Sequence, residues 1–283
     1  MEISTIGVLG AGTMGGGIAL VAAQAGFKVL LKGTELSRVN NSINRLESFM
    51  NKSVQKGKLT EEQKQETLRR ITPTNELSDF KEVDLVVEAI IENLELKKKA
   101  FSELDNVCKP ETIITTNTSS MSINMLAGAT KRPDRVAGMH FFNPPPIMKL
   151  VEVVRGHDTS DETVEVIFEV AKKMGKTTVE VKKDYPGFIV TRVNMAQIIE
   201  AIRLVEEGVA TPEDIDTALK LGLNWPMGPF EMQDFIGLDV SNSIMEYFND
   251  EFKEARWNPP QSLKALIRSG RLGKKSNSGW FNY

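Results

Sequence analysis

A run of closely spaced glycines near the start of the chain restricts the possible folds more than any other feature. Residues 10–15, GAGTMG, follow the apolar residues 5–9, and apolar residues at helical spacing continue to Gly26. Residues 28–31 have the composition of a second strand. A strand, the pattern G-x-G-x-x-G, a helix and a further strand are together typical of a Rossmann unit. The sequence therefore predicts an α/β domain that binds a dinucleotide.

Each residue type in this segment has a physical role in holding a dinucleotide. Gly10 permits a tight turn, Gly12 lets the pyrophosphate approach the backbone, and Gly15 lets the helix pack closely on the strand. Thr13 and Met14 lie at the expected helix N-terminus, where amide donors and the helix dipole attract an anion. These five residues are the first part of the predicted cofactor-binding site.

The end of the second strand bears on which cofactor is used. An acidic residue is expected here to bind the ribose 2′-hydroxyl of NAD, but this chain has Gly33. Without the acid there is no repulsion against a 2′-phosphate, and Lys32, Thr34 and Arg38 are nearby donors. Alternatively, Glu35 takes the acid's role two positions later. The predicted cofactor is NAD or NADP, with NADP favoured.

Composition excludes several classes of function. A length of 283 residues suits two domains, and a net charge of -3 argues against nucleic acid or an anionic membrane as partner. Cys108 is the only cysteine, so no internal disulfide forms and a reducing compartment is expected. Residues 3–27 carry no charge, but their seven glycines and the acidic Glu2 argue against a signal peptide or membrane span. We expect a cytoplasmic protein.

Polar residues follow two further predicted strands of the first domain. Three segments have the composition of buried strands, namely residues 83–89, 112–116 and 135–139. Residues 117–120, NTSS, follow the second of these segments, and His140 follows the third. Ligands bind at the carboxyl ends of strands in open α/β sheets, so Ser119 and His140 are expected at one edge. The alternative for this polar run is a helix cap supplied by Ser120 or Ser122.

One of only two histidines in the chain precedes a proline-rich turn and a glutamate. His140 is followed by three prolines at 144–146 and by Glu152, within a predicted strand at 150–154. A histidine held by a carboxylate is a common base near neutral pH. The alternative is a histidine at a strand end with no chemical role. Its expected position on the same edge as Ser119 favours catalysis.

The alternation of strands and helices ends near residues 184–187, which we interpret as a linker. We predict a Rossmann domain at residues 1–185, with a helical excursion at 37–71, and an all-α domain at 186–283. Apolar residues at 225–230 exceed what so small a domain needs. They favour a homodimer interface, although apolar contacts with the first domain would also account for them.

Taken together, the motifs resemble the short-chain L-3-hydroxyacyl-CoA dehydrogenases, in particular the bacterial 3-hydroxybutyryl-CoA dehydrogenases. The resemblance covers essentially the whole chain. Its specific segments are residues 10–15, 88–93, 117–120, 140–152, 184–192, 225–229 and 273–276. It implies a Rossmann domain followed by a dimerising helical domain, with the active site in the cleft between them. The implied reaction interconverts (S)-3-hydroxybutyryl-CoA and acetoacetyl-CoA by hydride transfer to or from NAD(P), without a metal.

The resemblance also implies roles for individual residues. His140 would be the general base, Glu152 would orient it, Ser119 would bind the substrate oxygen, and Asn143 would contact substrate. The positions that match CoA contacts are Lys52 and Lys56, which otherwise form an ordinary solvated helix face. The positions that match cofactor contacts are Glu92, Lys97, Asn117 and Lys275.

One position departs from the family pattern. The family usually has Asn where this chain has Thr191, whose single hydroxyl lies closer to the backbone than an amide would. We expect Thr191 to keep a weaker polarising contact, with Ser119 carrying more of the load. Two alternatives remain open: a dehydrogenase of a CoA-free hydroxy acid, which would commonly use a lysine base, and a non-catalytic NAD(P)-binding relative.

Overall fold

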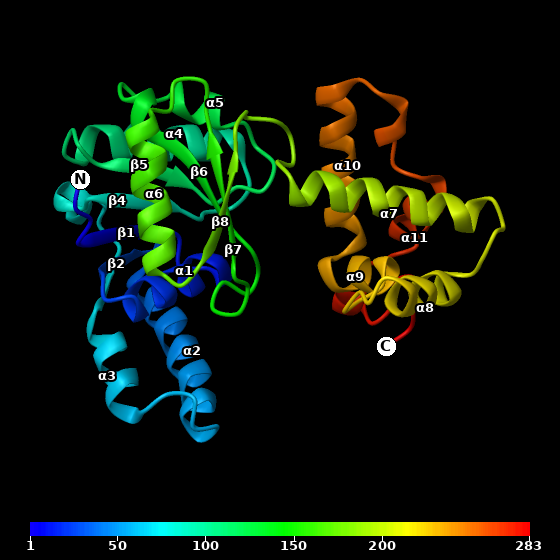
Figure 1. The fold of residues 1–283 in the computed structure, drawn as a ribbon, viewed down its shortest axis with the longest axis horizontal. Coiled ribbons are helices and arrows are strands. Elements are labelled where there is room, and N and C mark those ends of the chain that lie inside the picture. Colours follow the sequence, from blue (N-terminus) through cyan, green and yellow to red (C-terminus); the bar gives the residue numbers. More distant parts are fainter. The chain divides into compact units, whose positions relative to one another are not determined.

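The computed structural model describes residues 1–283, which form two compact units (Figure 1). Unit 1 is Met1–Phe188 and unit 2 is Ile189–Tyr283. Unit 1 is an α/β domain and unit 2 consists mainly of helices. The predicted fold class, a Rossmann-type domain followed by a helical domain, is confirmed.

Unit 1 is built on one eight-stranded sheet with the order β3-β2-β1-β4-β5-β6-β7-β8. The strands are β1 (Thr5–Leu9), β2 (Lys28–Lys32), β3 (Ile71–Thr74), β4 (Leu85–Glu88), β5 (Ile113–Thr116), β6 (Val136–Phe141), β7 (Leu150–Arg155) and β8 (Thr177–Val181). The first six are parallel, β7 runs antiparallel to β6, and β8 is parallel to β7. The carboxyl ends of β1, β4, β5 and β6 therefore lie at one edge.

Helices cover both faces of this sheet (Figure 1). The helices of unit 1 are α1 (Thr13–Gln24), α2 (Leu36–Gln55), α3 (Glu61–Arg69), α4 (Leu94–Val107), α5 (Ile123–Ala127) and α6 (Asp161–Lys173). On one face, Ile6 and Val8 pack in a core with residues of α1, α2 and α6. On the other, Leu9 and Val86 pack with residues of α4 and α5. The two cores follow the alternation of side chains along each strand.

The excursion between β2 and β4 differs in part from the sequence prediction. Its two helices, α2 and α3, extend away from the sheet (Figure 1), and Thr60 and Gln63 form the capping box at the start of α3. Residues 71–74, however, form strand β3 and do not close the helical segment. Its sequence ITPT contains Pro73, which cannot donate a ladder hydrogen bond and is tolerated because β3 lies at the sheet edge.

Unit 2 contains five α-helices around its own core. They are α7 (Val190–Glu206), α8 (Pro212–Gly222), α9 (Pro229–Ile236), α10 (Leu238–Phe252) and α11 (Gln261–Arg268). Thr211 caps α8 with its side chain and is followed by Pro212 at the first helical position, where a missing amide hydrogen costs nothing. None of the helices in either unit combines the length and the apolar composition needed to cross a lipid bilayer.

The prediction of helices throughout the second domain is wrong for its last residues. Residues 273–283 form isolated bridges and a short 3₁₀ turn, held by the buried carboxylate of Asp234. It accepts hydrogen bonds from the amides of Trp280 and Phe281, both 2.9 Å long. Side chains at Gly273 and Gly279 would collide with Asp234, so glycines permit this close approach.

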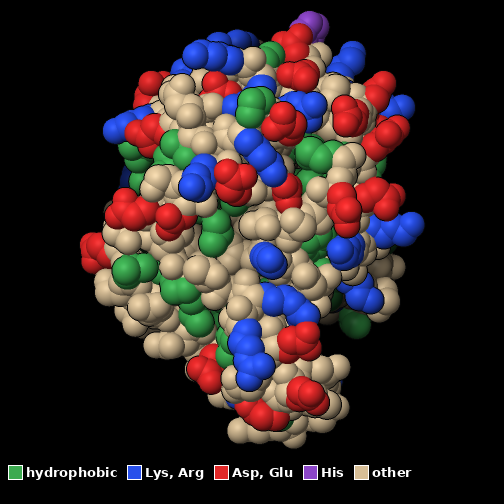
Figure 2. All heavy atoms as spheres, turned by 90° about the vertical axis from the view of Figure 1, so that its left-hand side faces the viewer, with side chains coloured by type: hydrophobic (Ala, Val, Ile, Leu, Met, Phe, Trp, Pro, Cys, Tyr) green, Lys and Arg blue, Asp and Glu red, His purple; other side chains and the backbone are tan.

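Charges of both signs are mixed on one face of the molecule. On the face shown in Figure 2, Lys and Arg side chains are interspersed with Asp and Glu, and hydrophobic side chains form only small groups. Neither sign of charge covers this face alone.

Candidate functional site

The glycine turn after β1 has the geometry of a dinucleotide cradle. Gly10 has a positive φ of 117°, and a Cβ there would lie 2.4 Å from the carbonyl oxygen of Ala89. A Cβ on Gly15 would lie 1.8 Å from the carbonyl oxygen of Gly10. At Gly12, by contrast, a Cβ would meet nothing within 4 Å, so this side of the turn is open. Gly12 is also the N-cap of α1 without a side-chain cap, which leaves first-turn amides for an anion.

The end of β2 carries Gly33 in place of an acid, and close packing around this glycine leaves little room for a side chain. A Cβ on Gly33 would lie 2.7 Å from Val39 Cγ2 and 3.3 Å from the Cβ of Ala11. Glu35, the alternative acid, is exposed and forms an ion pair with Arg38 at 3.6 Å. The other predicted contacts here are Lys32, which is half-buried, and Thr34, which is exposed. Gly33 thus allows α2 to pack closely and also leaves this strand end without an acidic side chain.

His140 and Glu152 form a buried pair between two strands. They lie directly opposite each other in the antiparallel β6–β7 ladder, and His140 Nδ1 is 2.7 Å from Glu152 Oε2. His140 is 5% exposed and Glu152 is fully buried. The rings of Phe142 and Phe188 lie 4.5 Å and 5.7 Å from the imidazole centroid. The carboxylate thus faces Nδ1, which assigns the proton to Nδ1 and leaves Nε2 for exchange with a ligand.

The sequence placed His140 after a strand, whereas it lies within β6, which continues to Phe141. The strand is longer than predicted because its last residues pair with β7: His140 with Glu152 and Phe141 with Val151. The backbone of both strands therefore fixes the histidine, and not only the turn that follows it.

The proline-rich loop after β6 is held from two sides. Pro145 packs against α1, where a Cβ on Gly17 would lie 2.8 Å from Pro145 Cδ. Lys176 Nζ donates to the carbonyl oxygens of Pro145 and Met148, at 2.5 Å and 2.8 Å. Burial lowers the pKa of Lys176. Asn143 is exposed within this loop, and the peptide bond that follows it is cis.

The polar loop after β5 lies next to the end of β6. The amide of Asn117 donates to the carbonyl oxygen of Glu88 at 2.8 Å, and its Oδ1 accepts from the amide of Phe141 at 2.9 Å. Asn117 therefore joins the ends of three neighbouring strands. Ser119 is half-buried, and its hydroxyl has no hydrogen-bond partner within the protein. Ser122 caps α5, as the alternative interpretation of this run predicted.

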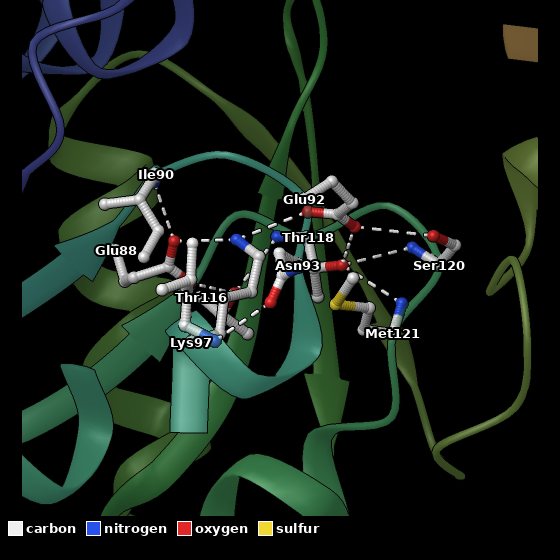
Figure 3. A network of polar contacts seen from close by, with 10 residues as sticks. Glu88, Ile90, Glu92, Asn93, Lys97, Thr116, Thr118, Ser120 and Met121 are labelled. Atoms are coloured by element: carbon white, nitrogen blue, oxygen red, sulfur yellow. Dashed lines mark hydrogen bonds and ion pairs between the residues drawn. The ribbon is translucent and has the colours of Figure 1, made fainter. Parts of the chain in front are cut away.

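A buried charge network, not predicted from the sequence, supports this loop (Figure 3). Glu88 Oε1 accepts from Lys97 Nζ and from the amide of Ile90, each at 2.7 Å. Its Oε2 accepts from the hydroxyl of Thr116 at 2.7 Å. Lys97 also lies 3.2 Å from Glu92, whose side chain is 41% exposed. The sequence singled out Glu92 and Lys97 as matches to cofactor contacts, but it did not indicate that they pair with each other or with Glu88.

The predicted linker also contains a residue with a defined structural role. Asp184 accepts hydrogen bonds from the Ser122 hydroxyl at 2.5 Å and from the amide of Asn124 at 2.9 Å. The carboxylate thereby stabilises the start of α5. The contact spans about sixty residues of sequence, which no local pattern reveals.

The remaining predicted contacts lie on α2 and in unit 2. Lys52 in the last turn of α2 and Lys56 at its C-cap are exposed and have no acidic partner. Thr191 lies in the first turn of α7 and is half-buried. Lys275 forms an ion pair with Asp239.

The features of unit 1 define a class of protein. An open glycine turn at a helix N-terminus, at the carboxyl edge of a parallel sheet, fits a dinucleotide. A buried histidine–carboxylate pair at the same edge can exchange a proton with a hydroxyl group. A protein with both is a dinucleotide-dependent dehydrogenase.

Comparisons with known proteins narrow this class. Residues 5–185 match the family model described as 3-hydroxyacyl-CoA dehydrogenase, NAD binding domain, and residues 187–283 match its C-terminal domain. A probable 3-hydroxybutyryl-CoA dehydrogenase of Bacillus subtilis is 46% identical, over 100% of this chain and 98% of the relative. A 3-hydroxybutyryl-CoA dehydrogenase of Clostridioides difficile is 42% identical, over 98% of this chain and 99% of the relative. The crystal structure of (S)-3-hydroxybutyryl-CoA dehydrogenase from Ralstonia eutropha has a TM-score of 0.97 at 40% identity, covering 100% and 99% of the two chains.

The chain belongs to the 3-hydroxyacyl-CoA dehydrogenase family. It is an NAD-dependent oxidoreductase of 3-hydroxyacyl-CoA substrates, and the predicted family, reaction class and dinucleotide cofactor are confirmed.

Proposed function

We propose that the protein interconverts (S)-3-hydroxybutyryl-CoA and acetoacetyl-CoA, with His140 as general acid and base. The four-carbon acyl group follows from the names of the full-length relatives. The observation that carries the chemistry is the 2.7 Å contact between His140 Nδ1 and Glu152 Oε2 at the sheet edge.

The test is a spectrophotometric assay of NADH and NADPH oxidation with acetoacetyl-CoA. Oxidation of neither cofactor would refute the proposal and would favour a non-catalytic dinucleotide-binding protein. Acetoacetate without CoA is the matched control, because preferential turnover of it would favour a CoA-free hydroxy acid as substrate.

Proton transfer follows from the orientation of the imidazole. A nicotinamide cofactor held by the glycine turn of residues 10–15 would supply the hydride exchange at C3 of the substrate. His140 Nε2 takes the proton of the 3-hydroxyl as the carbonyl forms, because Nδ1 already carries a proton directed at Glu152. In the opposite direction, the imidazolium returns this proton to the 3-oxygen.

Three further residues support this proton transfer in the proposal. Glu152 stabilises the imidazolium and fixes its ring, because it is fully buried and lies opposite the histidine in the ladder. Ser119 donates a hydrogen bond to the substrate oxygen, and its lack of a protein partner supports this role. Asn143 contacts substrate from the exposed part of the proline-rich loop.

The cofactor contacts in the proposal follow the glycine turn and the charge network. Gly10, Gly12 and Gly15 shape the turn, and the amides of Thr13 and Met14 hold the pyrophosphate at the start of α1. The further proposed contacts are Lys32, Gly33, Thr34, Glu92, Lys97, Asn117 and Lys275.

We propose that NADPH is used as well as NADH, because β2 ends without an acid that would repel a 2′-phosphate. The expected kcat/KM with NADPH is within about tenfold of that with NADH, since removing the acid removes the main discrimination. A preference for NADH of more than about a hundredfold would contradict this role of Gly33.

A designed pair of substitutions tests the same point from the opposite direction. Gly33→Asp combined with Val39→Ala supplies the acid and removes the methyl group that the new Cβ would meet. We expect kcat/KM with NADPH to fall by at least about tenfold relative to NADH. Val39→Ala alone is the control and should leave the cofactor ratio unchanged.

We propose that Thr191 supplies a weaker polarising hydrogen bond than the family's usual Asn. Thr191→Asn is then expected to raise kcat by about tenfold, less than the roughly 10²–10³-fold that loss of an entire oxyanion donor costs. Thr217→Asn, at an exposed position of α8, is the matched control in the same unit. An unchanged kcat in Thr191→Asn would show that this position does not polarise the substrate.

The proposal also covers CoA, assembly and location. Lys52 and Lys56 bind the anionic CoA moiety, supported by two exposed ammonium groups that lack acidic partners.

Residues 1–185 bind the cofactor, and residues 186–283 form a homodimer and contribute to substrate binding. Exposed apolar residues of unit 2, such as Leu221 at 82%, support dimerisation. A cytoplasmic location is supported by the single cysteine, Cys108, which is free and buried and so forms no internal disulfide.

A further inference from the structure

The charge network drawn in Figure 3 begins with a fully satisfied buried carboxylate. Glu88 is 0% exposed and accepts three hydrogen bonds, one of them from Lys97, whose side chain is 1% exposed. A buried ion pair is tolerated when its hydrogen bonds are complete, and its geometry is then tightly fixed. Glu88 and Lys97 therefore form a rigid ion pair at the end of β4 and the start of α4.

From this ion pair the network extends toward the edge of the sheet. Lys97 Nζ lies 3.2 Å from Glu92 Oε2, so the same ammonium group pairs with both carboxylates. Glu92 Oε1 in turn accepts hydrogen bonds from the hydroxyl groups of Thr118 and Ser120. The partly exposed carboxylate of Glu92 is thus held between Lys97 and the loop after β5.

Thr118 uses every hydrogen-bonding capacity of its hydroxyl in this network. Oγ1 donates to Glu92 and accepts from the amides of Ser120 at 3.3 Å and Met121 at 3.0 Å. A hydroxyl has one proton and two acceptor sites, so all three are occupied. The Thr118 side chain is buried, at 2% exposure.

A second set of hydrogen bonds joins the backbone of Thr118 to the same ion pair. The amide of Thr118 donates to Thr116 Oγ1 at 3.1 Å, and this hydroxyl donates to Glu88 Oε2 at 2.7 Å. The network therefore forms a closed ring that includes both Glu88 and Thr118. The turn that starts at Thr118 is fixed on both sides of Ser119.

We propose that Thr118 is a positioning residue that directs the hydroxyl of Ser119 at the substrate oxygen. Ser119 makes no hydrogen bond within the protein, so only its neighbours determine where its hydroxyl lies. Thr118 holds the backbone on the far side of Ser119 through two amides and is itself held by Glu92. This role deepens the proposed function, since it rests on Ser119 as the substrate contact.

The test compares Thr118→Val, which keeps the shape but removes the hydroxyl, with Thr118→Ser, which keeps the hydroxyl. We expect Thr118→Val to lower kcat with acetoacetyl-CoA by about tenfold, while Thr118→Ser stays within about threefold of the unaltered enzyme. Thr130→Val is the matched control, since its hydroxyl bonds to Ala127 O in a turn outside the network. It should leave kcat unchanged.

The decisive measurement repeats Thr118→Val in a Ser119→Ala background. If Thr118 acts through Ser119, the effect on kcat disappears there, because neighbours that act as one unit are not additive. An undiminished effect of Thr118→Val in that background would overturn the positioning role. So would a Thr118→Val enzyme with unaltered kcat.

A second variant covers the case in which Thr118→Val does not fold. Glu92→Gln leaves Thr118 in place but weakens the charge-assisted hydrogen bond that holds it. Its effect on kcat, measured at saturating cofactor because Glu92 is also a proposed cofactor contact, should likewise shrink when Ser119→Ala is present. An additive effect under these conditions would count against the inference. Absence of turnover by the unaltered enzyme would instead count against the proposed function.

Discussion

Replacing His140 with Gln is expected to lower kcat for acetoacetyl-CoA reduction by about 10²–10⁴-fold, the usual contribution of a general acid–base residue. Gln preserves approximate size and polarity at this buried position, but it cannot exchange a proton with the substrate oxygen. Binding of NADH, followed by the fluorescence of the cofactor, should be little changed, because the glycine turn lies after a different strand.

The second histidine of the chain provides a matched control. His157 is exposed at a turn after β7 and belongs to no predicted site. His157→Gln should leave kcat unchanged. If His140→Gln kept kcat within about tenfold of the unaltered enzyme, His140 would not be the acid–base residue.

Replacing Glu152 with Gln is expected to lower kcat by about 10²-fold or more, because the substitution changes which nitrogen of His140 carries the proton. The amide can place an N–H toward Nδ1, which favours the tautomer with its proton on Nε2. That tautomer cannot accept the proton of the 3-hydroxyl. The unaltered carboxylate only accepts, and so keeps the proton on Nδ1.

Glu180→Gln is the matched control for this change. Glu180 lies on the neighbouring strand β8 and pairs with Arg155 at 3.0 Å, away from the histidine. Thermal unfolding of each variant separates loss of activity from loss of fold. A folded Glu152→Gln enzyme with the kcat of the unaltered enzyme would disprove the orienting role.

The sequence predicted the elements of the site better than their pairing. The residues around His140 and Glu152 indicated two strands joined by a proline-rich turn, and both strands are present. What it did not indicate was that these residues lie exactly opposite one another in the ladder. A shift of one residue would turn Glu152 to the other face of the sheet, and hydrophobic alternation alone does not fix that register here because both strands are buried.

The charge network shows why other parts were missed. Glu88 follows an apolar run, and its partners Lys97 and Thr116 come nine and twenty-eight residues later. Their meeting depends on β4 lying beside β5, which is a property of the whole sheet. Gly33 illustrates the same limit, since its contact with Val39 gives a packing reason for a glycine that the sequence related only to cofactor choice.

The pairing of His140 with Glu152 has a consequence for how this protein can be altered. Two paired strands position His140 and Glu152, the proposed acid–base pair, and residues 143–149 connect these strands after Phe142, whose ring packs on His140. Insertions, deletions or exchange of this connection should therefore leave the position of His140 unchanged, provided that the β6–β7 ladder is kept. The connection carries Asn143, the proposed substrate contact, so changes there should alter the range of accepted acyl groups and leave the proposed proton transfer intact.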